Sequence, residues 1–125
     1  MNYLEAEKKL VQFLAGLLHL EPDQEIFAGN LPDGIPTGVT IDLESGIPAG
    51  VGQVNTFSVC VCGCFHSRTL CRENAFSITS ALPVFGQSDL LSIRTAPDQP
   101  LVFSGNTPEE KSIYSFQLKL ILTFI

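Results

Sequence analysis

The C-terminal stretch 112–125 carries the pattern that most constrains the fold. Apolar side chains occupy every second position there: Tyr114, Phe116, Leu118, Leu120, Leu122 and Phe124. A period of two sends alternate side chains to opposite faces of a sheet, whereas a helix would scatter them around its circumference. The pattern predicts a strand of about 40 Å at roughly 3.4 Å per residue. We expect so long an apolar strand inside the sheet, because an exposed apolar edge promotes aggregation.

The preceding residues supply the remaining elements of a small α+β domain. Apolar residues at helical spacing predict helices over 2–20, capped by Asn2, and over 66–82, capped by Ser67 and closed by Pro83 and Gly86. Alternation predicts strands over 39–44, 53–64 and 89–95, with shorter pairing segments at 26–27 and 101–103. Because neither face of 53–64 is charged, this strand should be central and covered on both sides. The expected fold is one domain, residues 1–125, with a single mostly antiparallel β-sheet of about four to five strands and two helices packed on one side.

Composition excludes several function classes. The formal net charge is −6 at pH 7, and the seven Lys and Arg residues do not cluster. Because nucleic-acid affinity comes largely from neutralised phosphates, specific DNA binding is not expected, and an anionic membrane surface is disfavoured for the same reason. The sequence has neither a membrane span nor a secretory signal, so we expect assembly in a cytoplasm with reduced cysteines.

The cysteines are the only set of residues that suggests chemistry: Cys60, Cys62 and Cys64 alternate along one strand, and Cys71 follows in the second helix. On an ideal strand the three sulfurs lie in a row roughly 7 Å apart, which does not suit a tetrahedral zinc ion. We therefore predict buried free thiols, with no metal and no cofactor. A zinc site and redox use remain the competing hypotheses.

Catalysis by a cysteine would require an activated thiolate. Cys64 and His66 are two residues apart at a helix start, but no orienting group or oxyanion hole accompanies them. The sequence also lacks phosphate-binding, nucleophile-elbow and metalloprotease motifs. We expect a protein that is not an enzyme.

The outline of the whole chain resembles the small tail terminator proteins (tail completion, or minor capsid) of long-tailed bacteriophages and prophages. The resemblance lies in an N-terminal helix, a hairpin with Pro/Gly-rich loops, and a strand running directly into a helix, FSVCVCGCFHSRTLCRENAFSITSAL (57–82). A strand, a proline-containing turn and a long last strand follow, LLSIRTAPDQPLVFSGNTPEEKSIYSFQLKLILTFI (90–125).

This resemblance implies a structural role in the virion. Members of the family form rings, commonly hexamers, that cap the tail tube, end its polymerisation and offer a surface to the head-completion protein. DNA passes through such a ring without specific binding. Another head–tail completion or minor capsid adaptor is the alternative within the same class.

Long Pro/Gly-punctuated loops at 21–38, 45–53 and 96–111 are the expected contact regions, because such loops commonly carry binding function. Their apolar residues look exposed and are the predicted subunit contacts: Ile26, Phe27, Leu31, Ile35, Ile47, Val51, Leu101 and Phe103.

Overall fold

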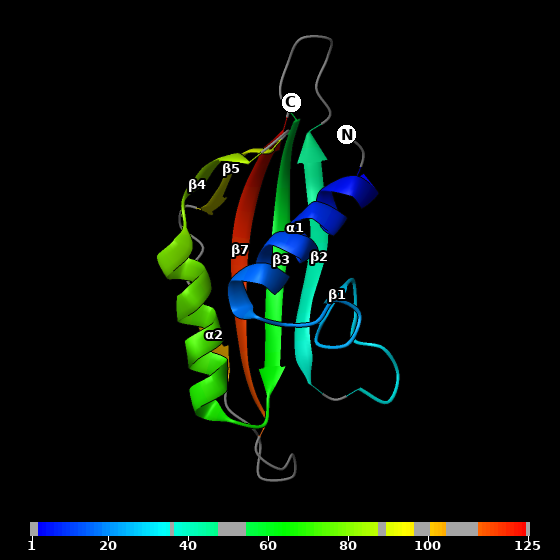
Figure 1. Cartoon of the computed structure of the whole chain (residues 1–125), viewed down its shortest axis with the longest axis vertical. Helices are drawn as coiled ribbons and strands as arrows, with labels where there is room; N and C mark the ends of the chain where they lie inside the picture. Colours follow the sequence, from blue (N-terminus) through cyan, green and yellow to red (C-terminus); the bar gives the residue numbers. More distant parts are fainter. Residues whose placement is uncertain are drawn as a thin grey trace.

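The computed structural model describes residues 3–35, 37–47, 55–87, 90–96, 101–104 and 113–124. Two helices lie on one side of a single twisted sheet (Figure 1). The helices are α1 (Tyr3–Leu18) and α2 (Arg68–Ala81). The strands are β1 (Ile26–Ala28), β2 (Gly38–Ile47), β3 (Asn55–Phe65), β4 (Val84–Gln87), β5 (Leu90–Thr95), β6 (Val102–Ser104) and β7 (Tyr114–Phe124).

The sheet runs in the order β1-β2-β3-β7-β5-β4, and β6 pairs with the part of β7 that β5 leaves free. Only the β1–β2 pair is parallel among the described strands. The predicted α+β class, the mostly antiparallel sheet and the interior position of the last strand are therefore confirmed. The described sheet has seven strands, more than the four to five expected.

The extra strands are short and lie at the sheet edges. Pro83 and Gly86 predicted only the end of the second helix, but the residues between them belong to β4, where Val84 and Phe85 pair with Ile93 and Ser92 of β5. A strand of four residues shows too little periodicity to be recognised alone, since its pairing partner rather than its own pattern defines it.

The core lies between the helices and one face of the sheet. On β7 the even-numbered side chains Phe116, Leu118, Leu120 and Leu122 are all buried, as the alternation predicted. Phe57, Val59 and Val61 of β3 and Val39 and Ile41 of β2 complete this layer. α1 packs over β1 and β2, while α2 packs over β3 and β7, so each helix covers part of the same apolar face.

Local hydrogen bonds set the helix ends. The Ser67 Oγ accepts a hydrogen bond from the Leu70 N–H at 3.2 Å, which confirms the predicted N-cap of α2. At the end of α1, His19 takes a left-handed conformation (φ 58°) and the Leu20 N–H reaches back to the Ala15 carbonyl at 3.0 Å. This hydrogen bond, from an N–H to the carbonyl five residues earlier, is the Schellman arrangement that ends a helix. The predicted Asn2 cap lies outside the described residues.

Candidate interaction surface

The sheet face opposite the helices carries small polar and sulfur-containing side chains. β3 is central, as predicted, but no described helix covers its second face, so the prediction that it is covered on both sides is wrong for that face. Cys60 is nevertheless buried there, whereas Cys62 and Cys64 are half-buried. Their shielding comes from neighbouring strands: the Gln117 Nε2 of β7 donates a hydrogen bond to the Cys60 Sγ at 3.2 Å.

The sulfur spacing also differs from the expected row. The Sγ atoms of Cys60 and Cys62 are 3.5 Å apart, half the separation predicted from strand geometry alone. Both side chains lean toward each other, because rotation about the Cα–Cβ bond lets sulfurs at alternate positions approach. The contact is a thiol–thiol hydrogen bond, and all four cysteines are free.

Protonated thiols follow from this environment. Burial, and then the hydrogen bond to Cys60, raise the pKa of Cys62 to about 12. Burial likewise raises the pKa of Cys64 and of Cys71. A raised pKa removes the thiolate that nucleophilic or redox chemistry needs at neutral pH. Among the described residues, no group of three or more His, Cys, Asp and Glu side chains is placed to hold a metal ion.

A β-bulge aims one acidic side chain across this face. The β2–β3 register shifts between Leu43 and Ser45, which leaves Glu44 as the extra residue. Its carboxylate crosses β3 and accepts hydrogen bonds from the Lys119 ammonium of β7 at 2.5 and 2.6 Å. The hydrogen bond to Glu44 raises the pKa of Lys119. The half-buried position of Lys119 agrees with the partly solvated odd-numbered face expected for the last strand.

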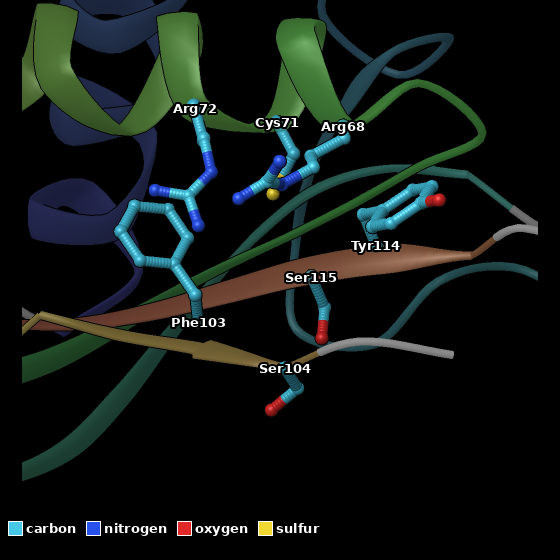
Figure 2. Close-up of a pocket in the computed structure, with 7 residues that line it drawn as sticks. All are labelled: Arg68, Cys71, Arg72, Phe103, Ser104, Tyr114 and Ser115. Carbon is cyan, nitrogen blue, oxygen red and sulfur yellow. The ribbon is translucent and has the colours of Figure 1, made fainter. Parts of the chain in front are cut away.

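A hollow of 180 Å³ opens at the other edge of the domain, between α2 and the paired strands β6 and β7 (Figure 2). Arg68 and Arg72 reach into it from α2, one helical turn apart, and Phe103, Ser104 and Tyr114 form its opposite wall. The Arg72 guanidinium carbon lies 4.5 Å from the centroid of the Phe103 ring, within range of a cation–π interaction. Two cationic groups beside hydroxyls make this hollow suited to a carboxylate or another anion.

The Phe103 ring also joins an exposed aromatic pair. Phe76 of α2 meets Phe103 edge to face, with ring centroids 5.7 Å apart, and remains 49% exposed. Aromatic side chains flanked by arginine are the composition that dominates binding energy at protein interfaces. We define Arg68, Arg72, Phe76 and Phe103 as the α2–β6 patch.

A larger groove of 550 Å³ lies on the other side of the α2 N-terminus. The end of α1, the segment before β2 and the start of α2 form its walls, with Leu18, Ile35, Phe65 and Leu70 as its main apolar side chains. The exposed His66 lies at this groove, and among the described residues no hydrogen bond joins it to Cys64, so the structure does not assemble a Cys–His pair.

The structure sorts the predicted contact residues into three groups. Ile26 and Phe27 are buried, 0% and 5% exposed, so their expected exposure is wrong: Ile26 belongs to the core cluster, and Phe27 is buried next to it on β1. Leu31, Ile35, Leu101 and Phe103 are half-buried and keep accessible surface. The side chain of Ile47 and the whole of Val51 lie outside the described residues.

Further large apolar residues are exposed on helices and strands rather than on the loops where contacts were expected. These are Leu70 and Phe76 on α2, Phe85 on β4 and Val102 on β6. A signal was present for Phe76, which falls off the helical stripe of Cys71, Ala75 and Ile78 that packs into the core. Phe85 gave no such signal, because its strand was not recognised.

No family model matches the chain, and no curated protein matches it. Among solved structures, a chain in the virion of a native gene transfer agent particle is similar with 14% sequence identity and a TM-score of 0.47. The similarity covers 96% of this chain and 90% of that one. No helix in the described part of the chain is long and apolar enough to cross a membrane.

Proposed function

We propose that this protein is a structural component of a phage or prophage virion that caps the tail tube, ends its polymerisation and provides the surface that joins the head. The observation that carries the proposal is the order of the elements. An N-terminal helix, the β2–β3 hairpin, β3 leading directly into α2, and a long final strand in the sheet interior follow the order of the resembled tail terminator proteins.

Features of the surface support a role in assembly rather than catalysis. The pKa values of Cys62, Cys64 and Cys71 are raised, and the exposed aromatic residues Phe76 and Phe85 lie on α2 and β4 rather than on loops. Large apolar side chains exposed on a rigid scaffold are typical of contact surfaces between proteins. We therefore propose that the protein acts through its surface and is not an enzyme.

The proposed partners follow from this role. Copies of the chain would form a closed ring, a hexamer, between the tail tube protein and the head-completion protein, with weak self-association before assembly. Half-buried Leu31, Ile35, Leu101 and Phe103 remain the proposed contacts between copies. The net charge of −6 suits a ring that DNA crosses, because negative charge discourages phosphate contacts. The virion tail end, reached by assembly in the bacterial cytoplasm, is the proposed location.

Electron microscopy of tails assembled with and without this protein tests the proposal. We expect tubes of unregulated length in its absence and an added ring at the tube end in its presence. Normal tails without the protein, together with no density at the tube end when it is present, would refute the proposal. Density at the head vertex instead would identify the alternative, a head-completion adaptor.

A further inference from the structure

The charges of this chain are divided between the two edges of the sheet. No Lys or Arg occurs between Lys9 and Arg68, whereas the segment 21–33 carries four acidic residues, Glu21, Asp23, Glu25 and Asp33. All four are exposed, and they surround β1, which forms one edge of the sheet. We call them the β1 acidic edge.

The opposite edge has an excess of basic residues, with three arginines against the exposed Glu73 of α2 among the described residues. Arg68 and Arg72 of the α2–β6 patch and the exposed Arg94 of β5 lie on the side of β7 remote from β1. Among the described residues no carboxylate forms an ion pair with these three arginines. The two edges lie on opposite sides of the domain in Figure 1, with β1 on the right and α2 on the left.

We propose that the α2–β6 patch of one copy binds the β1 acidic edge of a second copy, head to tail. The inference rests on the proposed function, since it assigns the contact through which the ring would close. Opposite charges on opposite edges favour repeated head-to-tail contacts, which close into a ring when the rotation between copies permits. A two-fold contact through one edge would instead oppose like charges.

The short edge strands support contact through side chains rather than through continued strand pairing. β1 and β6 have three residues each and β4 has four, so these strands themselves offer only short ladders to a neighbour, although β1 pairs with β2 only over Val39–Ile41. Each of the two surfaces also carries apolar side chains that the other could cover. Phe76 and Phe103 lie beside the arginines, and the half-buried Leu31 lies within the acidic segment. Charge would set the orientation while the aromatic pair supplies buried area.

Two charge-reversed variants of the full chain test the contact. The first carries Arg68→Glu and Arg72→Glu, which makes both edges acidic. The second carries Glu21→Lys and Asp33→Lys, which cancels the net negative charge of the β1 acidic edge and places two lysines on it. Asp23 and Glu25 are left unchanged because Asp23 has a left-handed φ of 64° and the Glu25 carboxylate accepts a hydrogen bond from the Glu21 N–H.

Sedimentation velocity over a concentration series measures the self-association of each protein. We expect wild-type association to weaken as salt rises from about 0.05 M to about 0.5 M, because the screening length falls well below 10 Å. Each variant alone should associate roughly tenfold more weakly than the wild type, since the first opposes like charges and the second removes the net attraction. An equal mixture should recover association, because alternating copies present complementary charges at every contact.

The matched control is Lys8→Glu, an exposed reversal on α1 that leaves both edges unchanged and should associate like the wild type. Association of this control weakened as much as that of the reversed variants, or no recovery when the two reversed variants are mixed, would overturn the proposed contact. Should a double variant fail to fold by circular dichroism, Arg68→Glu and Asp33→Lys repeat the test singly at exposed positions. If the mixed variants recover association but no ring forms on tail tubes, the contact stands and the proposed function is refuted. If a ring forms on tail tubes whether or not the charges are reversed, the proposed function stands and the contact is refuted.

Discussion

A methyl group added at Gly63 tests the tightest packing of the core. Gly63 lies directly opposite Phe116 in the β3–β7 pair, and the Phe116 ring covers it. An alanine Cβ would lie 2.2 Å from the Phe116 Cε1, about 1.3 Å inside an ordinary carbon–carbon contact of about 3.5 Å. The ring has little room to retreat, because it is 2% exposed and stacks on Phe65 at a centroid distance of 6.5 Å.

The change in the free energy of unfolding caused by Gly63→Ala is the sum of two opposing effects. Overpacking a core costs roughly 1–3 kcal/mol, and the lower conformational entropy of the unfolded alanine chain returns about 0.5–1 kcal/mol. We therefore expect Gly63→Ala to lower the free energy of unfolding by roughly 1–2 kcal/mol, which corresponds to a fall in Tm of about 4–8 °C for a domain of this size.

Chemical denaturation of four proteins measures the effect: wild type, Gly63→Ala, Phe116→Leu and the double variant. Phe116→Leu alone destabilises by removing ring contacts, but in its presence the Gly63→Ala change should cost less, since the obstructing ring is gone. Gly16→Ala is the control, because nothing lies within 4 Å of its added Cβ on α1, and it should stabilise by about 0.5–1 kcal/mol. Gly63→Ala as stable as Gly16→Ala, or additive costs in the double variant, would show that Phe116 does not pack on Gly63.

Four further predictions concern other parts of the structure. Leu120→Asp should abolish cooperative folding, because an unpaired buried charge costs several kcal/mol of a total of about 5–15; Lys119→Asp should be milder, and equal damage in thermal unfolding would contradict the assignment of faces. Ser67→Ala should cost about 1 kcal/mol in denaturant unfolding by removing the α2 cap, and a neutral result would argue against that cap. Burial, and then Asp42, raise the pKa of Glu7, so its contribution to stability is lost as pH rises through the folded-state pKa; Glu7→Gln should stabilise at pH 7 and lose that advantage below pH 4 in pH-dependent melts. With its pKa raised to about 12, Cys62 should be alkylated far more slowly at pH 8 in the folded than in the unfolded protein, and equal rates by peptide mass spectrometry would contradict its burial.

Local sequence determined the elements that are marked by a short-range pattern, either a repeat of apolar residues or a capping residue at a helix end. The alternation in β7 specified both its length and its buried face. In a period of two, the apolar positions all share one face of the strand, and that face must be the one turned to the core. The Ser67 cap and the stripe of Cys71, Ala75 and Ile78 specified α2 in the same way. These signals suffice because backbone geometry fixes which side chains share a face before any partner is known.

The tertiary structure alone decided features that depend on distant residues. Ile26 and Phe27 looked like exposed loop residues, but pairing with Val39 and Thr40 places them in a strand, where both side chains are buried. The role of the bulge at Glu44 is visible only in the tertiary structure, because its ion-pair partner Lys119 lies on β7, two strands away from β2. Such contacts join residues far apart in the chain, and no local period records them.

The candidate surface shows the same division. Charge asymmetry is visible in the sequence as a long interval without Lys or Arg, but only the strand order places the acidic segment and the arginines at opposite edges. The sequence predicts Phe103 as a contact residue, whereas its neighbours in the structure, Arg72 and Phe76, come from the earlier helix α2. They meet because α2 packs across β7 beside β6, and that packing is the outcome of burying the whole core at once.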